Sequence, residues 1–134
     1  MSEPENERVV QEMYAAMGRG DIPGVLDKLA DDVEWRIAGP SELPYAGLHR
    51  GRGEVAKFFE NFGRSAEFEM FEPREYFSRG DRVVVLGHER QRVKATGSVV
   101  ETEWAMVFTL RDGKIARYHN LVDTHAVAAA HLGS

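Results

Sequence analysis

Residues 82–123 read RVVVLGHERQRVKATGSVVETEWAMVFTLRDGKIARYHNLVD, and this stretch decides the fold. Its apolar runs predict three long strands, over residues 82–93, 99–110 and 115–123. Asp112-Gly113 lies between the last two runs and is a strong hairpin signal, because Gly adopts the positive φ that a tight reversal needs. Thr96-Gly97-Ser98 is a weaker signal of the same kind. The stretch therefore predicts an antiparallel meander that curls into one wall of a pocket.

Helical spacing of apolar residues surrounds this meander. It predicts four helices, over about residues 7–17, 21–30, 51–64 and 124–132. Asp21 is expected to cap the second helix, and Asp123 or Thr124 the last, because an N-cap oxygen accepts an otherwise unpaired backbone N–H. Residues 1–6 are expected to be frayed.

Three further segments precede the meander. Residues 33–37 alternate apolar and polar side chains, which predicts a short strand with one buried face. Ala38–Arg50 is rich in Gly and Pro and is expected to be a loop. Residues 67–77 predict a strand that is bent or broken near Pro73, since Pro cannot donate a ladder hydrogen bond.

The composition excludes several classes of protein. The 134 residues, 43% hydrophobic and 29% charged, indicate a single globular domain over residues 1–134. A net charge of −5 argues against a nucleic-acid partner. The chain has no cysteine and its five histidines lack two-turn ligand spacing, so no metal or cofactor is expected. No apolar run approaches the roughly 20 residues of a membrane span and the N-terminus lacks a signal-peptide pattern, so a cytoplasmic location without a membrane partner is expected.

Three segments carry a family resemblance: VVQEMYAAMGRGDIPGVLDKLADDVEWRIAG from residue 9, PYAGLHRGRGEVAKFFENF from residue 44 and WAMVFTLRDGKIARYHNLVDTHAVAAA from residue 104. Together they resemble the SnoaL-like and ketosteroid-isomerase-like branch of the nuclear transport factor 2-like superfamily. The resemblance implies a cystatin-like α+β fold. In it, three helices from the N-terminal half lie across the mouth of a cone-shaped, curved antiparallel sheet, and a short C-terminal helix follows. It also implies a homodimer formed through the outer sheet face, and a family of isomerases, polyketide cyclases, dehydratases, epoxide hydrolases and binding proteins.

The catalytic residues of steroid isomerases do not carry over to this chain. Met13, Ile37 and Met106 fall where that enzyme type has its two oxyanion donors and its proton-shuttling aspartate. None of the three can donate or move a proton, so steroid isomerisation is not expected. The carboxylates of an epoxide-hydrolase-like site are missing as well. The nearest equivalents of a dehydratase-like site are His88 and Asn120.

The same alignment suggests which face of each strand lines the cavity. The inward set is Leu86, His88, Arg90, Trp104, Met106, Phe108, Tyr118, Asn120 and Val122. Because side chains alternate along a strand, a slip of one residue exchanges the two faces. The opposite register stays open and points these residues inward: Glu89, Glu103, His119, Leu121 and Asp123.

His88 is the leading acid/base candidate, since histidine titrates near about pH 6.5. Arg90, Tyr118 and Asn120 are expected to hold or polarise a substrate oxygen. The expected ligand contacts are Met13, Met17, Trp35, Tyr45, Phe58, Phe62, Leu86, Trp104, Met106, Phe108 and Val122. These candidate residues also have structural interpretations. Arg90 can form an ion pair, Asp123 can cap a helix, and the aromatic residues can pack in the core.

These patterns predict a protein that binds a small, largely apolar molecule with a polar group. If the protein is catalytic, acid–base chemistry such as dehydration, isomerisation or cyclisation is expected. The missing carboxylates favour the alternative of a non-catalytic ligand-binding or dimerisation module. A further alternative is an epoxide or ester hydrolase that uses Glu103 or Asp123 from the opposite register.

Overall fold

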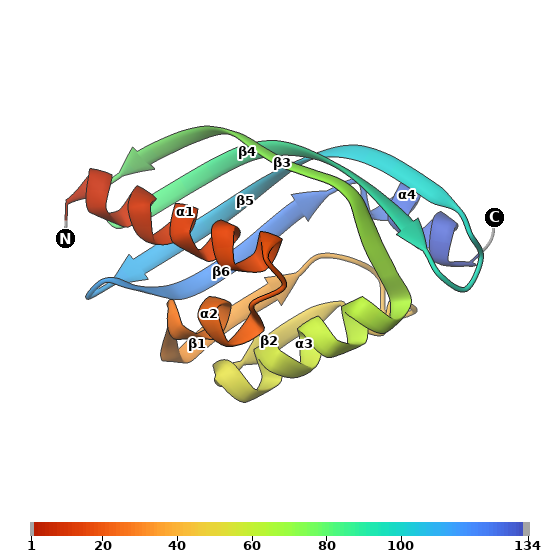
Figure 1. Ribbon diagram of the computed structural model, residues 1–134, viewed down its shortest axis with the longest axis horizontal. Helices are drawn as coiled ribbons and strands as arrows, with labels where there is room; N and C mark the ends of the chain where they lie inside the picture. Colours follow the sequence, from red (N-terminus) through yellow and green to blue (C-terminus); the bar gives the residue numbers. More distant parts are fainter. Residues whose placement is uncertain (1, 133–134) are drawn as a thin grey trace.

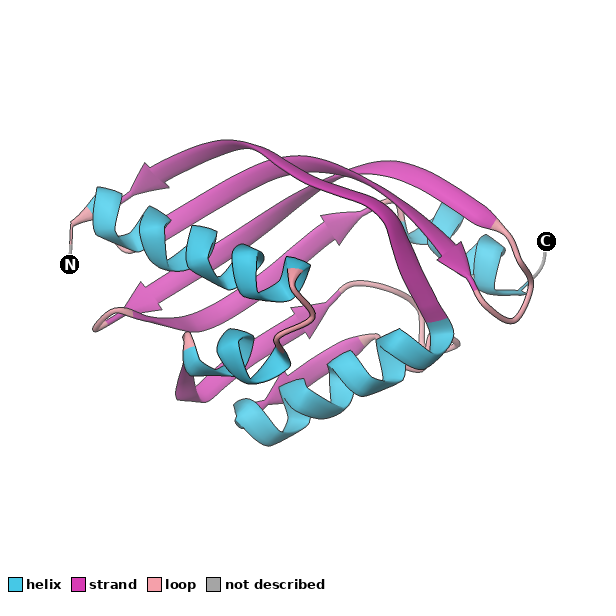
Figure 2. Ribbon diagram, viewed as in Figure 1, coloured by secondary structure: helices cyan, strands magenta, loops and turns pink. Residues whose placement is uncertain are grey.

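The computed structural model describes residues 2–132. In chain order its elements are α1 (Glu3–Gly18), α2 (Ile22–Asp27), β1 (Leu29–Ile37), β2 (Gly47–Arg50), α3 (Gly51–Ser65), β3 (Ala66–Arg79), β4 (Arg82–Val93), β5 (Val99–Arg111), β6 (Lys114–Val122) and α4 (Thr124–Leu132). The sheet curves around α1, α2 and α3, which lie on its concave side, while α4 lies beyond the far end of β6 (Figures 1 and 2). This is the α+β cone that the sequence predicts.

The six strands form one sheet in the order β2-β1-β6-β5-β4-β3. The pairs β3–β4, β4–β5 and β5–β6 are antiparallel, so the predicted meander is confirmed. The sheet as a whole is mixed rather than antiparallel, because β1 pairs with β6 in parallel. Parallel neighbours need a long connection between them, and here α3 and the four strands β2, β3, β4 and β5 supply it.

The two hairpins of the meander turn where the sequence places them. Asp112 and Gly113 have φ values of 51° and 78°, the pair of positive angles that defines a type I′ turn. Gly97, in the turn before β5, has a φ of 72°. The local turn residues thus explain where the strands of the meander end.

Side-chain caps fix the starts of three helices. α1 begins at Glu3 rather than near residue 7, because the Ser2 hydroxyl accepts the Glu5 N–H at 3.3 Å. Of the segment expected to be frayed, Met1 lies outside the described residues. Asp21 accepts the backbone N–H of Gly24 at 3.0 Å, and Asp123 accepts that of residue 126 at 2.9 Å, so both predicted caps are confirmed.

The predicted loop needs correction, and of the two alternatives predicted near Pro73 the structure has an irregular strand and not a broken one. The expected loop 38–50 ends in a short strand, β2, whose four residues pair with the edge of β1. β3 runs unbroken through Pro73, with an irregularity of the pairing between Pro73 and Glu75. Proline is tolerated there because β3 is an edge strand and its outer side has no ladder to join. A register irregularity of this kind bends a strand locally, in agreement with the prediction.

The core fills one end of the cone. Met13 of α1, Phe108 of β5 and Ile115 of β6 are at most 1% exposed. The ring of Tyr14 packs edge-on against Phe108, with centroids 5.9 Å apart. Beyond Met13 and Tyr14 the side chains no longer fill the space under α1, and a cavity begins there.

None of the helices within residues 2–132 is long and apolar enough to cross a membrane. Within the same residues, no group of three or more His, Cys, Asp and Glu side chains is placed to hold a metal ion.

Candidate functional site

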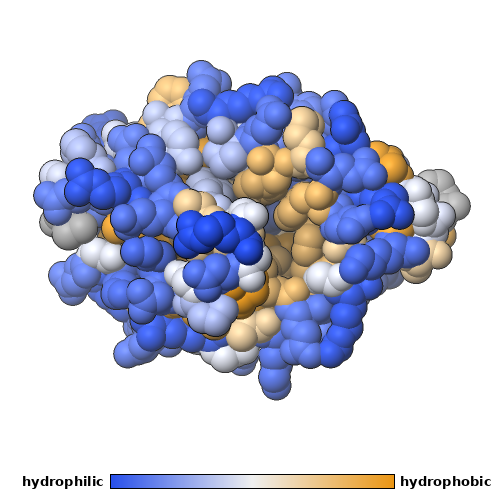
Figure 3. All heavy atoms as spheres, viewed as in Figure 1, coloured by the Kyte–Doolittle hydropathy of each residue, from blue (hydrophilic) through white to orange (hydrophobic). Residues whose placement is uncertain are grey.

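A cavity of about 200 Å³ lies on the concave side of the sheet. Figure 3 shows its mouth as an apolar hollow in the middle of this face. Helices and loops contribute Met13, Tyr14, Met17, Ile22, Ala38, Tyr45, Phe58, Phe59, Phe62 and Val127 to its lining. The sheet contributes Trp35, Ile37, Phe68, Phe71, Glu89, Gln91, Met106, Tyr118, Asn120 and Val122.

Aromatic rings form a large part of the wall. Trp35 on β1 and Tyr118 on β6 are paired across the parallel ladder, and their rings stack with centroids 3.9 Å apart. Phe58 and Phe59 of α3 also pack against Trp35, with centroids 6.2 and 5.8 Å away. The cavity therefore offers flat, apolar surfaces that suit a planar ligand.

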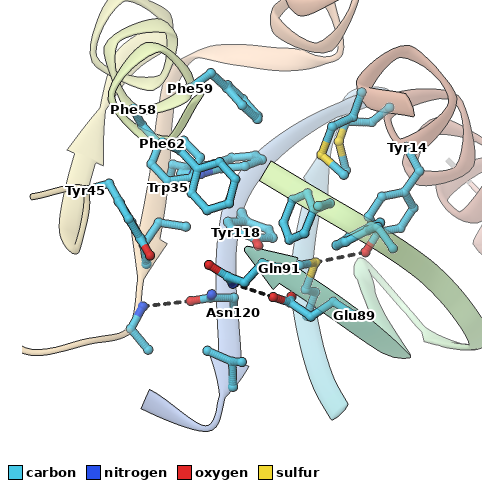
Figure 4. A pocket seen from close by; sticks show the side chains of 18 of the residues that line it. Tyr14, Trp35, Tyr45, Phe58, Phe59, Phe62, Glu89, Gln91, Tyr118 and Asn120 are labelled. Carbon is cyan, nitrogen blue, oxygen red and sulfur yellow. Dashed lines mark hydrogen bonds between the residues drawn. The ribbon is translucent and has the colours of Figure 1, made fainter. Parts of the chain in front are cut away.

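Glu89 is the ionisable carboxyl group of this lining, and it is 5% exposed. The Gln91 side-chain amide donates to its Oε2 at 2.6 Å (Figure 4). Both residues extend from β4 into the same space, because residues two apart lie on one face of a strand. Among the described residues, no protein group donates a hydrogen bond to the other oxygen, Oε1.

Burial raises the pKa of Glu89 to about 7, and the hydrogen bond from Gln91 offsets only part of that effect. Burial also raises the pKa of Tyr118 and of Tyr45, and the negative charge of Glu89 raises both further. The two hydroxyl groups therefore remain protonated beside the carboxyl group. The cavity thus holds one group that can exchange a proton near neutral pH and two that can donate hydrogen bonds.

Three other polar contacts position the lining. The Asn120 side-chain oxygen accepts the backbone N–H of Ala38 at 2.7 Å, which ties β6 to the loop after β1. The Tyr14 hydroxyl donates to the sulfur of Met106 at 3.1 Å. The Tyr45 hydroxyl lies 2.8 Å from Nε2 of His131. Figure 4 shows the first two as dashed lines on opposite sides of Glu89.

The structure brings many of the predicted site residues together. These line the cavity: Met13, Met17, Trp35, Tyr45, Phe58, Phe62, Met106, Tyr118, Asn120 and Val122. Trp104 and Phe108 lie on the same face of β5 as Met106 and are 4% and 0% exposed, but they pack in the core beneath Tyr14 instead of lining the cavity. The roles of these residues in binding or catalysis stay predictions.

The expected orientation of Leu86, His88 and Arg90 is wrong. None of them lines the cavity, and Leu86 is 37% exposed. Instead, His88 Nε2 lies 2.9 Å from Oε2 of Glu101 and Arg90 donates to Oε1 of the same carboxylate at 2.9 Å. The three residues belong to the convex face of the sheet, so His88 cannot be the acid/base group of the cavity.

The pairing of β4 with β5 gives the reason. Gly87 is directly opposite Trp104, and opposed residues of an antiparallel pair project to the same face. Because Trp104 faces the core, Gly87 does too, and its neighbour His88 must face outward. A methyl group on Gly87 would collide with the Trp104 ring, so the indole lies directly over the glycine.

The opposite register is correct for β4 alone. Glu89 points inward, as that register requires, whereas Glu103 is opposite His88 on the convex face. Asp123 is exposed and caps α4. The hydrolase alternative, which needs an inward-pointing Glu103 or Asp123, therefore has no carboxylate in the cavity from either position.

Sequence reasoning did not assign a site role to Glu89, Gln91, Tyr14 or Phe59. The signal for Glu89 was present but hidden. The inward glycine at position 87 has no side chain that would mark its face as buried. The outward Leu86 is hydrophobic and suggests a buried position. The pattern of apolar and polar residues in β4 therefore fits both registers. The usable signal was cross-strand geometry, since only a small residue can lie opposite a buried Trp104.

Comparison with known proteins agrees with this architecture. The family model of the SnoaL-like domain matches residues 10–118. The chain is 38% identical to an NTF2-like protein from Burkholderia xenovorans LB400, with 98% of each chain covered and a TM-score of 0.89. It is 30% identical to an NTF2-like protein of unknown function from Burkholderia pseudomallei K96243, over 97% of this chain and 98% of that chain, with a TM-score of 0.88.

A third similar structure is that of TerC co-crystallized with polyporic acid. It is 27% identical, over 96% of this chain and 98% of that chain, with a TM-score of 0.85. Comparison with curated proteins gave no match. The fold and the cavity thus define a cone-shaped protein of the NTF2-like superfamily. Within it, the chain belongs to the SnoaL-like domain family, which confirms the resemblance seen in the sequence.

Proposed function

We propose that this SnoaL-like protein binds a small, largely aromatic molecule in the cavity and moves a proton on it, with Glu89 as the acid/base group. The observation that carries the proposal is a buried carboxyl group with a pKa of about 7 among aromatic walls. Near neutral pH such a group is present in both protonation states, which suits proton transfer. In this proposal Glu89 has the acid/base role that was predicted for His88 from the sequence.

The surroundings of Glu89 favour one type of proton transfer. An ionised Glu89 can remove a proton from a carbon next to a carbonyl group, and the electron pair then moves to the carbonyl oxygen. The hydroxyl groups of Tyr118 and Tyr45 line the same cavity and can donate hydrogen bonds to that oxygen. Return of the proton from Glu89 to another carbon of the enolate completes an isomerisation. Attack by the enolate carbon on a second carbonyl group of the same molecule forms a ring, and departure of a β-hydroxyl group that takes the proton from Glu89 releases water.

The size of the cavity limits the ligand. An apolar cavity of roughly 150 Å³ binds one benzene ring, so a cavity of about 200 Å³ admits a substituted ring or two fused rings. Larger molecules can extend through the mouth. The TerC structure co-crystallized with polyporic acid supports binding of small molecules by this fold and makes that compound a useful second probe.

The test uses 2-tetralone, a bicyclic ketone with acidic protons beside its carbonyl group. Exchange of these protons for deuterium in D₂O is followed by proton NMR. We expect wild-type protein to accelerate exchange and Glu89→Gln to lose about a hundredfold or more of that rate, the usual effect of removing a general base. The rate should rise with pH as Glu89 ionises, with a midpoint near 7.

Glu101→Gln is the matched control, because Glu101 lies on the convex face and pairs with His88 and Arg90. It should exchange the ketone at the wild-type rate. A Glu89→Gln variant as active as wild type would contradict the role of Glu89. Binding of 2-tetralone without accelerated exchange would favour the alternative of a non-catalytic ligand-binding module.

We further infer that the protein forms a homodimer through the convex sheet face. Leu86 and Leu121 flank Ala105 on this face and are 37% and 49% exposed. Both ends of the strands carry charges of both signs, with Glu34 beside Arg117 at one end and His88 and Arg90 beside Glu101 at the other. A two-fold axis across the strands would place the apolar row of one chain against that of its partner.

The expected result is a particle of two chains in analytical ultracentrifugation. Leu121→Glu should shift the mass towards one chain, because it places negatively charged carboxylates against each other at the apolar row. Leu132→Glu, at a 64% exposed position on α4, is the control and should leave the mass unchanged. A wild-type protein that sediments as a single chain would contradict the dimer.

A further inference from the structure

Tyr45 and His131 form a pair at the α4 end of the cavity. The Tyr45 hydroxyl oxygen lies 2.8 Å from Nε2 of His131, and Tyr45 is 3% exposed. Its ring packs edge-on against Phe58, Phe62 and the imidazole, with centroids 6.2, 5.1 and 5.5 Å away. These contacts fix the ring, so the direction of the hydroxyl proton is the remaining freedom of this side chain.

The imidazole is held in place by the C-terminal helix. Asp123 caps the first turn of α4, and Val127 in its middle lines the cavity. Near its end, the Thr96 hydroxyl donates to the carbonyl oxygen of Ala130 at 2.8 Å, which ties α4 to the turn between β4 and β5. His131 is therefore presented to Tyr45 by an anchored helix.

Two arrangements of the hydrogen bond are possible chemically. Burial lowers the pKa of His131, so the ring is neutral at pH 7 and has one N–H and one lone pair. If Nε2 carries the lone pair, the Tyr45 proton points at His131 and the cavity meets only an acceptor oxygen. If Nε2 carries the proton, it donates to the Tyr45 oxygen, and the Tyr45 O–H is free to point into the cavity.

The charge of Glu89 favours the second arrangement. Glu89 lines the same cavity, and its negative charge raises the pKa of Tyr45 in addition to the effect of burial. A negative charge attracts the hydrogen end of an O–H dipole, which stabilises the Tyr45 proton on the cavity side. A ligand oxygen that gains negative charge during proton transfer would attract the same proton.

We propose that His131 is a positioning residue, whose Nε2–H directs the Tyr45 hydroxyl proton towards a carbonyl or enolate oxygen of the ligand. The inference rests on the proposed function and deepens it. If it is correct, Tyr45 donates a hydrogen bond to the ligand and Glu89 exchanges the proton. Helix α4 then belongs to the site, and the ligands are carbonyl compounds.

The first test reads the tautomer directly. The ring nitrogens of ¹⁵N-histidine-labelled protein are assigned by long-range proton–nitrogen NMR, with His131→Gln identifying the resonance. We expect the proton on Nε2 at pH 7.5. A proton on Nδ1 alone would overturn the proposal, whatever the protein does with a substrate. This measurement needs no ligand and no active variant.

The second test compares 2-tetralone with tetralin, the hydrocarbon that lacks the carbonyl oxygen. We expect Tyr45→Phe and His131→Phe each to weaken binding of 2-tetralone about tenfold, the scale of one lost hydrogen bond. Both should leave binding of tetralin within about twofold. His131→Gln, whose amide can still donate, should restore most of the ketone affinity. Equal losses for ketone and hydrocarbon would show a structural role only and overturn the proposal.

The double variant separates action through Tyr45 from independent action. If His131 acts through the hydroxyl, His131→Phe should have no further effect on ketone binding in the Tyr45→Phe background. Effects that multiply would overturn the proposal. The proposed function fails differently, since it fails when bound 2-tetralone does not exchange its protons faster, while the binding and NMR results stand.

Discussion

Two glutamates on neighbouring strands, Glu89 on the concave face and Glu101 on the convex face, have opposite surroundings. Glu89 is 5% exposed, and burial raises its pKa to about 7. Glu101 lies at the surface, where hydrogen bonds from His88 and then Arg90 lower its pKa. At neutral pH, therefore, the carboxyl group of Glu89 on one face of the sheet is close to half protonated, whereas that of Glu101 on the other face is fully ionised.

The difference shows that local sequence does not decide the chemistry of a charged residue here. His88, Glu89, Arg90 and Gln91 follow one another, yet alternate residues belong to different environments. The convex face satisfies its charges with opposite charges. The concave face leaves one carboxyl group with a single amide partner in an apolar cavity. Such a group costs stability when ionised, which is typical of a functional site.

The largest expected effect on stability is that of Glu89→Gln. The folded chain keeps the Glu89 proton up to about pH 7, while the unfolded chain loses it near 4.5. The folded state therefore binds more protons in this window, and the free energy of unfolding falls as pH rises from 4.5 to 7. The loss is about 3 kcal/mol for a shift of this size. Because glutamine cannot ionise, Glu89→Gln should gain that amount over wild type at pH 8, measured by urea unfolding.

Glu101→Gln is the control and should act with the opposite sign. The pKa of Glu101 is lowered, so its contribution is present above the unfolded value and is lost as pH falls through the folded value. This variant should be slightly less stable than wild type at pH 8, and added salt should reduce the difference. A Glu89→Gln variant whose advantage over wild type does not change between pH 5 and pH 8 would contradict the assigned burial.

The next largest effect is expected from Gly87→Ala. A methyl group there would collide with the Trp104 ring and lie 2.6 Å from the carbonyl oxygen of Glu72. The backbone cannot yield freely, so we expect a loss of about 1–3 kcal/mol in the free energy of unfolding. Gly63→Ala is the control: nothing lies within 4 Å on α3, and a gain of about 0.5–1 kcal/mol is expected there. Equal effects of the two changes would contradict the packing of Trp104 over Gly87.

The smallest effect is expected from His88→Ala. His88 contacts Glu101 on the convex face and does not line the cavity. Exchange of 2-tetralone should therefore stay within about twofold of the wild-type rate, far from the effect of losing a general base. The electrostatic contribution of His88 lowers the pKa of Glu89, so its removal should move the midpoint of the pH–rate profile upward. A decrease of tenfold or more in the exchange rate would contradict the conclusion that His88 lies outside the site.

The sequence was sufficient at several places where local signals decide structure. Asp112-Gly113 placed a hairpin that the structure has with both φ values positive. Asp123 placed a helix whose bounds, Thr124–Leu132, agree with the expectation. β2 was missed, because its four residues become a strand only by pairing with β1. The β4 register was missed, because its alternation is interrupted by an inward glycine at 87.

The candidate site divides in the same way. The aromatic residues of its wall, such as Trp35 and Phe58, were predicted because they repeat with the period of their strand or helix. The acid/base group was not, because the choice between His88 and Glu89 depends on which residue of β5 lies opposite Gly87. The chain alone therefore determined the strands of the meander, the Asp112-Gly113 turn and the Asp21 and Asp123 caps, since these depend on neighbours within a few residues. Only the tertiary structure decided that Glu89 is buried and that Tyr45 meets His131, because burial and long-range contact exist only after distant segments pack together.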